Sequence, residues 1–289
     1  MRIAVVGAGG QLGSAMAQAC GAGHEVTRFD RASLDITDPD AVAQALGRAR
    51  PDAIVNCAGY NAVDAAETHP VDAMQANAFA VRSLARAARE LGAALVQFSS
   101  DFVFDGAASA PMTEDVAPNP RSAYAMSKLL GEWFAAEVPQ AYVLRVESLF
   151  GAGPGGPDKG SLAAIVNGLR AGQVVRVFHD RTGSPTFVHD ASTATLALLE
   201  RRCEPGLYHC VNSGAATWLE VAREAARVLG VEPALEIVSV ADVTLPAARP
   251  RYCAMSSGKL AAATGVSMPT WQDALGRYLL ERRYPQDRT

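Results

Sequence analysis

Short apolar runs alternate with longer amphipathic stretches over the first half of the chain. Five apolar runs are predicted strands: Ile3–Val6, Glu25–Phe29, Ala53–Cys57, Leu95–Ser99 and Ala141–Val146. Four stretches between them have helical spacing: Leu12–Cys20, Pro39–Leu46, Val71–Leu91 and Ala123–Val138. This alternation predicts an α/β fold with a doubly wound parallel sheet and helices on both faces. Ligands of such folds bind at the carboxyl ends of the strands.

The alternation becomes irregular in the second half. Gly151–Pro157 is rich in glycine and proline, which predicts a loop. We therefore assign residues 1–150 to one domain and residues 151–289 to a smaller C-terminal lobe. Leu207–Val211 has the apolar character of another core strand, so the two parts are expected to interleave, with about 187–211 returning to the first domain.

Composition and charge narrow the functional class. Hydrophobic residues make up 49% of the chain and charged residues 19%, which is typical of a soluble globular protein. The net charge is −4 and no basic run occurs, which argues against a nucleic-acid partner. No membrane span or signal peptide is recognisable, so we expect a cytoplasmic protein. The five cysteines and five histidines have no metal-ligand spacing, and no structural metal is expected.

A glycine-rich turn, Gly7–Gly13, follows the first predicted strand and opens the first helix. Glycines there permit a tight turn and a close approach of a pyrophosphate to backbone amides at a helix N-terminus. The strand before and the helix after favour a dinucleotide site over a ligand-free loop, so residues 1–150 are predicted to form an NAD(P)-binding, Rossmann-like domain. The candidate contacts in the turn are Gly7, Gly9, Gly10, Gln11 and Leu12.

The end of the second strand bears on the choice of dinucleotide. The carboxylate of Asp30 could accept hydrogen bonds from a ribose, as in NADH, or could simply cap a turn. The neighbouring Arg31 could pair with the 2′-phosphate of NADPH. Because both are present, the sequence leaves NADPH or NADH open as the cofactor. Asp35 and Ile36 lie slightly further along and could border the adenine.

Tyr124 and Lys128 form the sharpest chemical motif. Their i, i+4 spacing places both side chains on one helix face. A nearby ammonium lowers the pKa of a phenol, which could then give its proton to a substrate carbonyl oxygen. Ser100, at the end of the fourth strand, could hydrogen-bond the same oxygen. These three residues are the predicted catalytic set.

Several segments match a known family. Gly7–Gly13 resembles a G-x-x-G-Q-x-G turn, Asn56–Glu67 resembles N-A-A-x-T-A-V-D-x-A-E, and Ser99–Gly106 resembles S-T-D-Y-V-F-D-G. Gly183–Thr186 and Arg249–Pro250 match later segments. Over nearly its whole length the chain resembles the dTDP-4-dehydrorhamnose reductases, a branch of the extended short-chain dehydrogenase/reductases. The resemblance implies that NADPH or NADH reduces C4 of a dTDP-linked 4-keto-6-deoxysugar.

The resemblance also extends the set of site residues. It implies the triad Ser100, Tyr124 and Lys128, with the last two also touching the cofactor. Further cofactor candidates are Cys57 (otherwise a packed thiol), Ala58, Gly59 and Asn77. The candidate substrate contacts are Asp101, Phe102, Val103, Phe104, Glu147, Ser148 and Arg249.

Two residues differ from the family pattern at positions that the resemblance places in the sugar-binding part of the site. Phe102 replaces a tyrosine, and Ser148 replaces an aromatic residue with Glu147 beside it. A change in the residues that line the sugar pocket is expected to alter which keto-sugar binds. Glu147 could instead pair with Arg145 or Arg181. The acidic residue that some members use for a metal is Ala15 here, so no magnesium site is carried over.

Two other functions stay open. One is a nucleotide-sugar epimerase or dehydratase; dehydratases usually carry a glutamate after the strand-end aspartate, where this chain has Phe102 after Asp101. The other is a non-catalytic regulatory subunit of methionine adenosyltransferase, which keeps the same fold. The intact Ser100, Tyr124 and Lys128 favour catalysis. The resemblance leaves a homodimer open as the oligomeric state.

Overall fold

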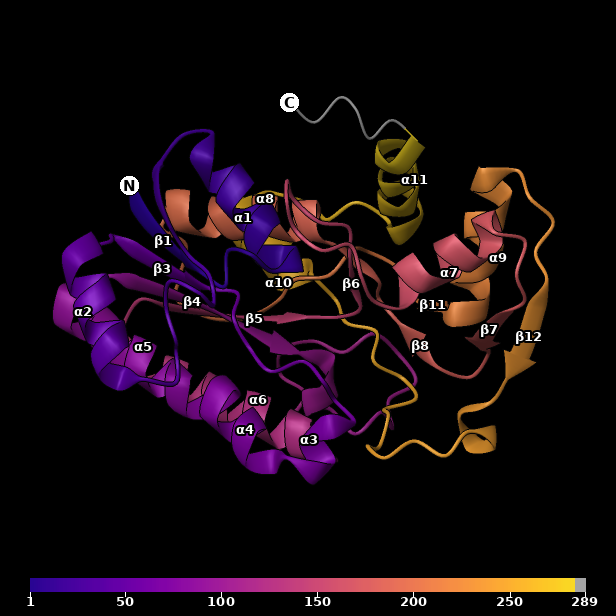
Figure 1. Ribbon diagram of the computed structural model, residues 1–289, viewed down its shortest axis with the longest axis horizontal. Helices are drawn as coiled ribbons and strands as arrows, with labels where there is room; N and C mark the ends of the chain where they lie inside the picture. Colours follow the sequence, from indigo (N-terminus) through magenta and orange to yellow (C-terminus); the bar gives the residue numbers. More distant parts are fainter. Residues whose placement is uncertain (284–289) are drawn as a thin grey trace.

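The computed structural model describes residues 1–283 and has a six-stranded parallel sheet at its centre (Figure 1). The strand order is β10-β5-β4-β3-β1-β2, and each neighbouring pair is parallel. The strands are β1 (Arg2–Val6), β2 (Glu25–Phe29), β3 (Ala53–Asn56), β4 (Ala94–Ser100), β5 (Ala141–Val146) and β10 (Gly206–His209). The order reverses at β1 and β3, which is where such sheets bind ligands.

Helices cover both faces of this sheet. Ile3 and Val5 face one buried cluster, whereas Ala4 and Val6 face the other, because successive side chains of a strand point to opposite sides. The first face is covered by α1 (Gln11–Gly21), α8 (Val188–Glu200) and α10 (Gly258–Thr264). The second is covered by α2 (Pro39–Ala49), α5 (Ala80–Leu91) and α6 (Ala123–Ala135). The predicted doubly wound α/β fold is confirmed.

The predicted helix Val71–Leu91 is helical over its whole length, but it contains a π-helical turn that the prediction did not include. The structure has α3 (Ala65–Thr68), α4 (Pro70–Met74), a π-helical turn η1 (Gln75–Phe79) and then α5. Asn77 lies within the π-helical turn, and its side chain bonds the loop after β3 instead of facing solvent. Its carbonyl oxygen lies against Gly131 of α6, where a larger residue would not fit. A π-helical turn commonly marks a functional site.

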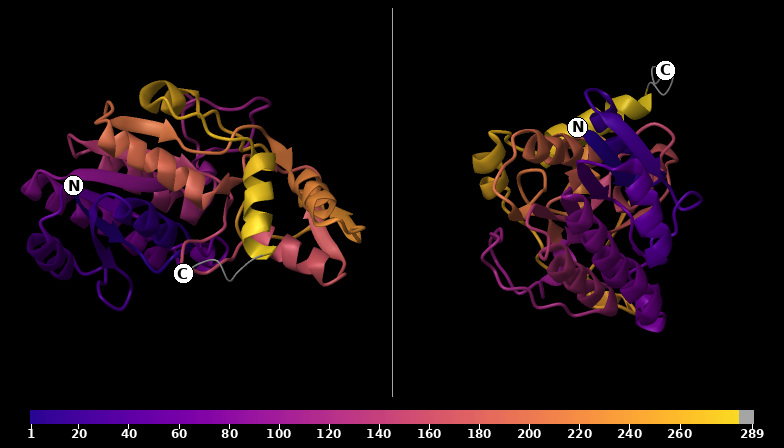
Figure 2. Two further views of the ribbon diagram at one scale, coloured as in Figure 1. Left: turned by 90° about the horizontal axis from the view of Figure 1, so that it is seen from above. Right: turned by 90° about the vertical axis from the view of Figure 1, so that its left-hand side faces the viewer.

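The second half builds a lobe beside the sheet, with α7, α9, β7 and β12 at its far side (Figures 1 and 2). Three two-stranded pairs and a separate apolar cluster hold it together. Its strands are β6 (Leu149–Phe150), β7 (Val175–Phe178), β8 (Thr182–Gly183), β9 (Thr186–Phe187), β11 (Ala216–Thr217) and β12 (Leu235–Val238). Its helices are α7 (Ser161–Arg170), α9 (Trp218–Leu229) and α11 (Trp271–Arg283), with a short 3₁₀ turn η3 (Val240–Asp242); another 3₁₀ turn, η2 (Asp101–Val103), follows β4 in the first half of the chain.

The lobe and the sheet are interleaved in sequence. β10 lies beside β5, and α8 packs against α1, so the segment between them belongs to the central layer. The division at residue 150 stays a prediction. Within the described residues no helix is long and apolar enough to cross a membrane.

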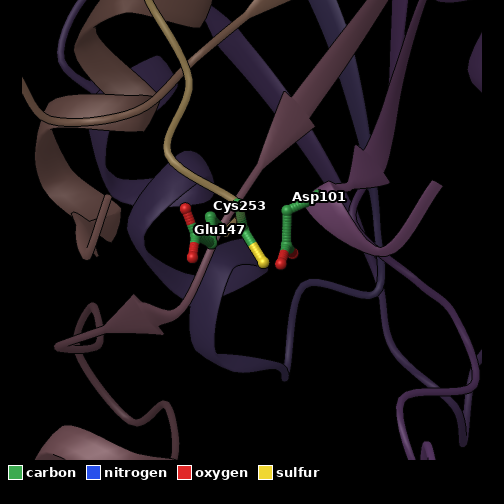
Figure 3. Close-up of side chains that lie close together, drawn as sticks. All are labelled: Asp101, Glu147 and Cys253. Carbon is green, nitrogen blue, oxygen red and sulfur yellow. The ribbon is translucent and has the colours of Figure 1, made fainter. Parts of the chain in front are cut away.

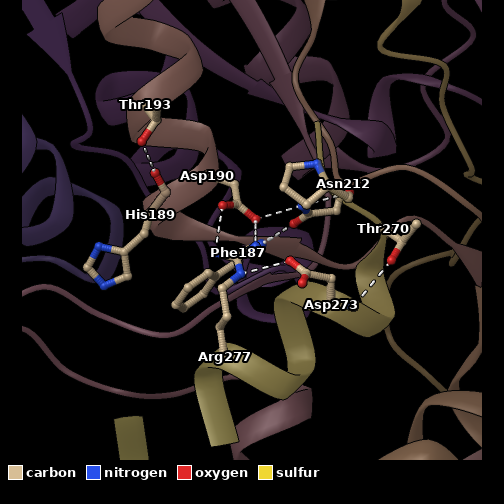
Figure 4. A network of polar contacts seen from close by, with 9 residues as sticks. Phe187, His189, Asp190, Thr193, Asn212, Thr270, Asp273 and Arg277 are labelled. Carbon is tan, nitrogen blue, oxygen red and sulfur yellow. Dashed lines mark hydrogen bonds and ion pairs between the residues drawn. The ribbon is translucent and has the colours of Figure 1, made fainter. Parts of the chain in front are cut away.

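A partly buried polar network connects α11 to α8 (Figure 4). The Arg277 guanidinium donates to both carboxylate oxygens of Asp190, at 2.9 and 2.7 Å. Asn212 donates to the same carboxylate at 2.7 Å and accepts from the backbone N–H of Phe187. Charge-assisted bidentate pairs of this kind fix orientation as well as adding stability.

Candidate active site

The glycine turn is a tight connection between β1 and α1. Gly7 has φ +79°, a conformation that favours glycine. The N–H groups of Gly7 and Ala8 both donate to the carbonyl of Phe29, at 2.7 and 2.9 Å. A Cβ on Gly7 would lie 2.6 Å from the backbone nitrogen of Ala58, so the loop after β3 touches the turn.

The N-terminus of α1 is open to an anion. Its N-cap residue is Gly10, which has no side chain to occupy the free N–H groups. Gly9 is exposed, and the nearest atom to a Cβ there would be the Cβ of Asp30, at 3.5 Å. Leu12 is buried in the core. The helix end has free N–H groups, and the glycines before it carry no Cβ that would block an approaching pyrophosphate.

The glycine- and proline-rich loop after β6 lies against the first turn of α1. Gly153 donates its N–H to Ser14 Oγ at 3.0 Å, and Gly156 also touches Ser14. The side-chain amide of Gln11 donates to the carbonyl of Lys159 at 3.0 Å. The predicted cofactor contact Gln11 therefore also holds this loop in place.

Asp30 and Asp35 both cap their own turns. Asp30 Oδ1 accepts from the N–H of Ala32 and from the N–H and hydroxyl of Ser33, and the Ser33 bonds lower its pKa. Asp35 Oδ1 accepts from Thr37 in the same way. Arg31 is exposed beside Asp30. Ile36 is half-buried and packs against the core.

The loop after β3 packs between the glycine turn and Lys128. Cys57 donates its N–H to Val6, and burial raises the pKa of its thiol. A Cβ on Gly59 would lie 2.8 Å from Asn77 Oδ1 and 3.9 Å from Lys128 Nζ. Asn77 bonds both the N–H and the carbonyl of Tyr60, which fixes the course of this loop.

The three predicted catalytic residues meet at the carboxyl end of β4. Tyr124 and Lys128 lie one turn apart on α6, which begins at the N-cap Ser122. The Tyr124 hydroxyl is hydrogen-bonded to Ser100, the last residue of β4. Lys128 Nζ donates to the carbonyl of Phe98 at 2.6 Å. All three are at most 7% exposed.

The pKa of the Tyr124 phenol shifts in the direction opposite to the one expected from the sequence. Burial raises the pKa of Tyr124 well above its usual value, and Lys128 is not a cause of any shift. Burial lowers the pKa of Lys128 to about 8, while the nearby Glu132 opposes that change. For Lys128, desolvation therefore outweighs the attraction to Glu132. A phenol that stays protonated is the form needed to give a proton to a carbonyl.

The side chains of Asp101, Glu147 and Cys253 lie close together (Figure 3). Ligand atoms of Asp101, Glu147 and Cys253 are all within 4.8 Å of one another, and all three residues are buried. Ser100 Oγ is 2.9 Å from Asp101 Oδ1. Burial raises the pKa of both carboxyl groups, and for Glu147 the charge of Asp101 raises it further.

Glu147 does not pair with Arg145, because that guanidinium is bound to Glu132. Its carboxylate accepts from the N–H of Ser184 at 2.5 Å and contacts Gly183 so closely that a side chain there would not fit. The charge of Arg181 lowers the pKa of Glu147, although burial raises it more.

Phe102 forms the outer side of the site. Its ring meets Tyr124 edge-on with centroids 5.5 Å apart. The guanidinium groups of Arg181 and Arg249 lie 5.4 and 5.6 Å from the same ring centre. Arg249 is also paired with Asp64 at 2.8 Å.

The remaining substrate candidates differ in their surroundings. Val103 and Phe104 are buried in an apolar cluster, so they support the turn after β4 from within. Ser148 is half-buried and has φ +44°, an uncommon conformation for a residue with a side chain. Such strain is often found at ligand sites.

Two residues of this region were missed by the sequence analysis. The sequence analysis named Arg181 only as a possible partner of Glu147, yet Arg181 lies over Phe102 and faces both buried carboxyl groups. Arg181 also lines a cavity of about 450 Å³ with Trp218 and residues of α7 and β7. Cys253 gave no signal, because its isolated position in the sequence does not reveal what it packs against.

Comparisons with known proteins agree with this arrangement. The family model described as "RmlD substrate binding domain" matches residues 1–283. A dTDP-4-dehydrorhamnose reductase of Streptomyces griseus is 37% identical over 279 residues, which cover 94% of this chain and 90% of the relative.

Solved structures are similar over the same length. A dTDP-4-dehydrorhamnose reductase of Clostridium acetobutylicum has a TM-score of 0.92 and 31% identity, covering 98% of this chain and 100% of its own. That of Bacillus anthracis, in complex with NADP, has a TM-score of 0.92 and 30% identity, covering 97% and 99%. The resemblance seen in the sequence is confirmed, and the chain belongs to the RmlD substrate binding domain family.

Proposed function

We propose that this protein is a reductase that uses NADPH or NADH to reduce the C4 keto group of a dTDP-4-keto-6-deoxysugar. The observation that carries the proposal is the meeting of Ser100, Tyr124 and Lys128 at the carboxyl end of β4, beside the glycine turn. The names of the relatives support the same reaction.

The triad supplies the proton side of the reduction. Tyr124 donates its phenolic proton to the keto oxygen, and its raised pKa keeps that proton available. Ser100 hydrogen-bonds the same oxygen and stabilises the negative charge that develops on it. Lys128 holds the nicotinamide ribose, since its amine lies at the loop that follows β3.

The residues around the glycine turn fit a dinucleotide. The pyrophosphate would lie at the open N-terminus of α1, against Gly9 and Gly10, with Ala58, Gly59 and Asn77 beside the ribose. When bound, the reduced nicotinamide supplies the hydride. We propose NADPH as the preferred donor, because Arg31 is exposed next to the turn and the Bacillus anthracis relative holds NADP.

The second lobe supplies the sugar-nucleotide side. Arg181 and Arg249 flank Phe102 and bring positive charge to the outer side of the triad, which suits a diphosphate. Phe102 and Ser148 then lie where they can select the sugar, whereas Glu147 is buried and bound to the N–H of Ser184.

We also propose that the protein acts in the cytoplasm as a homodimer. All five cysteines are free thiols, as is usual in a reducing compartment. Four large apolar side chains stay exposed on the neighbouring segments α4, η1 and α6: Val71, Phe79, Met126 and Trp133. Exposed apolar groups concentrated on adjoining elements suit a protein interface.

The two alternative functions are less well supported. An epimerase returns its hydride and consumes no cofactor, whereas the relatives named above are reductases. A regulatory subunit has no need of Ser100 hydrogen-bonded to Tyr124 in a buried site.

The test is oxidation of NADPH and of NADH, followed at the nicotinamide absorbance, with dTDP-4-keto-6-deoxysugars generated in the assay. A reductase consumes one dinucleotide for each alcohol formed. Binding of dinucleotide without any oxidation would contradict the proposal, and interconversion of sugars without consumption would favour the epimerase.

A further inference from the structure

The buried group formed by Asp101, Glu147 and Cys253 is not explained by carbonyl reduction with the triad alone. Asp101 and Glu147 are 2% and 3% exposed, and their carboxyl groups lie close together beside Cys253 (Figure 3). Asp101 Oδ2 is buried and has no hydrogen-bond partner among the described residues. An unpartnered buried carboxylate oxygen is costly, so its protonation state needs an account.

The charges around the pair indicate how many protons it holds. The groups that face the two carboxyls are Arg181, Tyr124, Tyr252 and Cys253. Only Arg181 is cationic, because burial keeps the tyrosines and the thiol protonated. Two ionised carboxylates would leave a buried excess of negative charge. One shared proton leaves a single negative charge opposite Arg181, and like carboxyl pairs commonly titrate in two separated steps.

A hydrogen-bonded path leads from this pair to the reacting phenol. Ser100 Oγ donates to Asp101 Oδ1 at 2.9 Å and accepts from the N–H of Phe102 at 3.2 Å, and it also interacts with the Tyr124 hydroxyl. A serine hydroxyl can accept one proton while it donates another, because it rotates freely about its C–O bond. When Asp101 carries the proton, the Ser100 hydroxyl turns from Asp101 toward the phenol, and each step of the path then joins a donor to an acceptor.

We propose that Asp101 and Glu147 share one proton and pass it through Ser100 to Tyr124 as the phenol protonates the keto oxygen. The carbonyl π bond breaks, the delivered hydride forms the new C–H bond, and the phenolic proton forms the O–H bond. As the phenolic proton leaves, the Ser100 hydroxyl turns from the keto oxygen to the Tyr124 oxygen; its proton moves to that oxygen, and the Asp101 proton moves to Ser100. The pair is left ionised beside Arg181 and regains one proton from water after the product leaves.

This proposal rests on the proposed reduction, but it has a test that needs no substrate. Infrared spectra of the free protein between pH 5 and 9, roughly spanning the range between ordinary carboxyl and thiol titration, should show the carbonyl band of a buried carboxylic acid at neutral pH. The Glu147→Gln variant should lose that band, because Asp101 then faces Arg181 without a competing carboxylate and ionises. Cys253→Ala should keep it.

The infrared test can fail in two ways. If the carbonyl band persists in Glu147→Gln, burial alone keeps Asp101 protonated. That result would overturn the proposal that Asp101 and Glu147 share one proton. Stoichiometric zinc or another divalent metal in the purified protein, with no acid band, would overturn it as well, because metal ligands are ionised. Failure of the reductase assay alone would leave these spectra unchanged, so the two failures are distinguishable.

The kinetic test separates a relay from a merely structural role. For Asp101→Asn and Glu147→Gln we expect kcat to fall about 10- to 100-fold, within the ~10²–10⁴-fold that positioned proton transfer contributes. The dissociation constant of NADPH should stay unchanged. The fall of kcat at alkaline pH should begin at lower pH in Glu147→Gln, with a larger solvent deuterium isotope effect. An unchanged pH profile and isotope effect would overturn the relay.

Discussion

Arg145 of β5 and Glu132 of α6 form a bidentate ion pair inside the protein. The Arg145 Nε–Glu132 Oε1 distance is 2.9 Å and the Nη2–Oε2 distance is 2.7 Å, with side chains only 2% and 7% exposed. Glu132 also accepts from the hydroxyl of Ser99 at 2.5 Å. Since Glu132 lies one turn after Lys128, this pair fixes the catalytic helix against the two strands whose ends carry the site.

Glu132→Ala should therefore be strongly destabilising. It removes one partner and leaves the Arg145 charge buried, which typically costs about 3–5 kcal/mol of unfolding free energy. Urea unfolding measures this cost. The matched control is Asp52→Ala, which breaks the exposed pair with Arg2 and should cost about 1 kcal/mol or less. Equal losses in the two variants would contradict this role for the buried pair.

Tyr124→Phe should remove most turnover and leave the fold and NADPH binding nearly intact. The change deletes only the hydroxyl that gives the proton, so kcat should fall about 10²–10⁴-fold. Steady-state kinetics and fluorescence titration with NADPH measure the two properties. Tyr208→Phe is the control, because that buried hydroxyl donates to Glu204 away from the site. Near-normal kcat in Tyr124→Phe would refute the assignment.

NADPH binding should weaken as pH rises through about 8. Burial lowers the pKa of Lys128 to about 8, so its ammonium, which would hold the ribose, becomes a neutral amine above that pH. If one proton is linked to binding, the dissociation constant rises about tenfold per pH unit beyond the pKa. Lys128→Met should bind weakly at every pH without this slope, whereas Lys259→Met should behave like the parent. A pH-independent constant in the parent would sink the idea.

The elements of the fold were predictable because each is encoded locally. Glu25–Phe29 and Ala141–Val146 are strands over the predicted ranges, since short apolar runs in an alternating chain leave few other structures. The π-helical turn was not predictable, because it depends on contacts of Asn77 with Tyr60 and Ser127, which are distant in sequence.

The residues of the site also fall into two groups: those that could be predicted from the sequence and those that could not. Ser100 and Tyr124 could be brought together by reasoning, because the helix that follows a strand of a parallel sheet begins at the edge where the strands end. Arg181 and Cys253 could not, because each reaches Asp101 from the second lobe through loops whose course no local pattern fixes. The sign of the Tyr124 shift was also missed, since it depends on how deeply the phenol is buried.

Three glycine substitutions separate what the turn does for the fold from what it does for the dinucleotide. Gly7→Ala should destabilise the protein and abolish binding: the left-handed backbone costs about 1–2 kcal/mol, and the new Cβ would lie 2.6 Å from the Ala58 nitrogen. Gly9→Ala meets only the Asp30 Cβ, at 3.5 Å, so stability should hold while NADPH binding weakens. Gly21→Ala, in α1 with no atom within 4 Å, should leave binding unchanged and add up to about 1 kcal/mol. Urea unfolding and NADPH titration of all three variants test these expectations. Normal NADPH binding by Gly9→Ala would show that no phosphate lies against this turn.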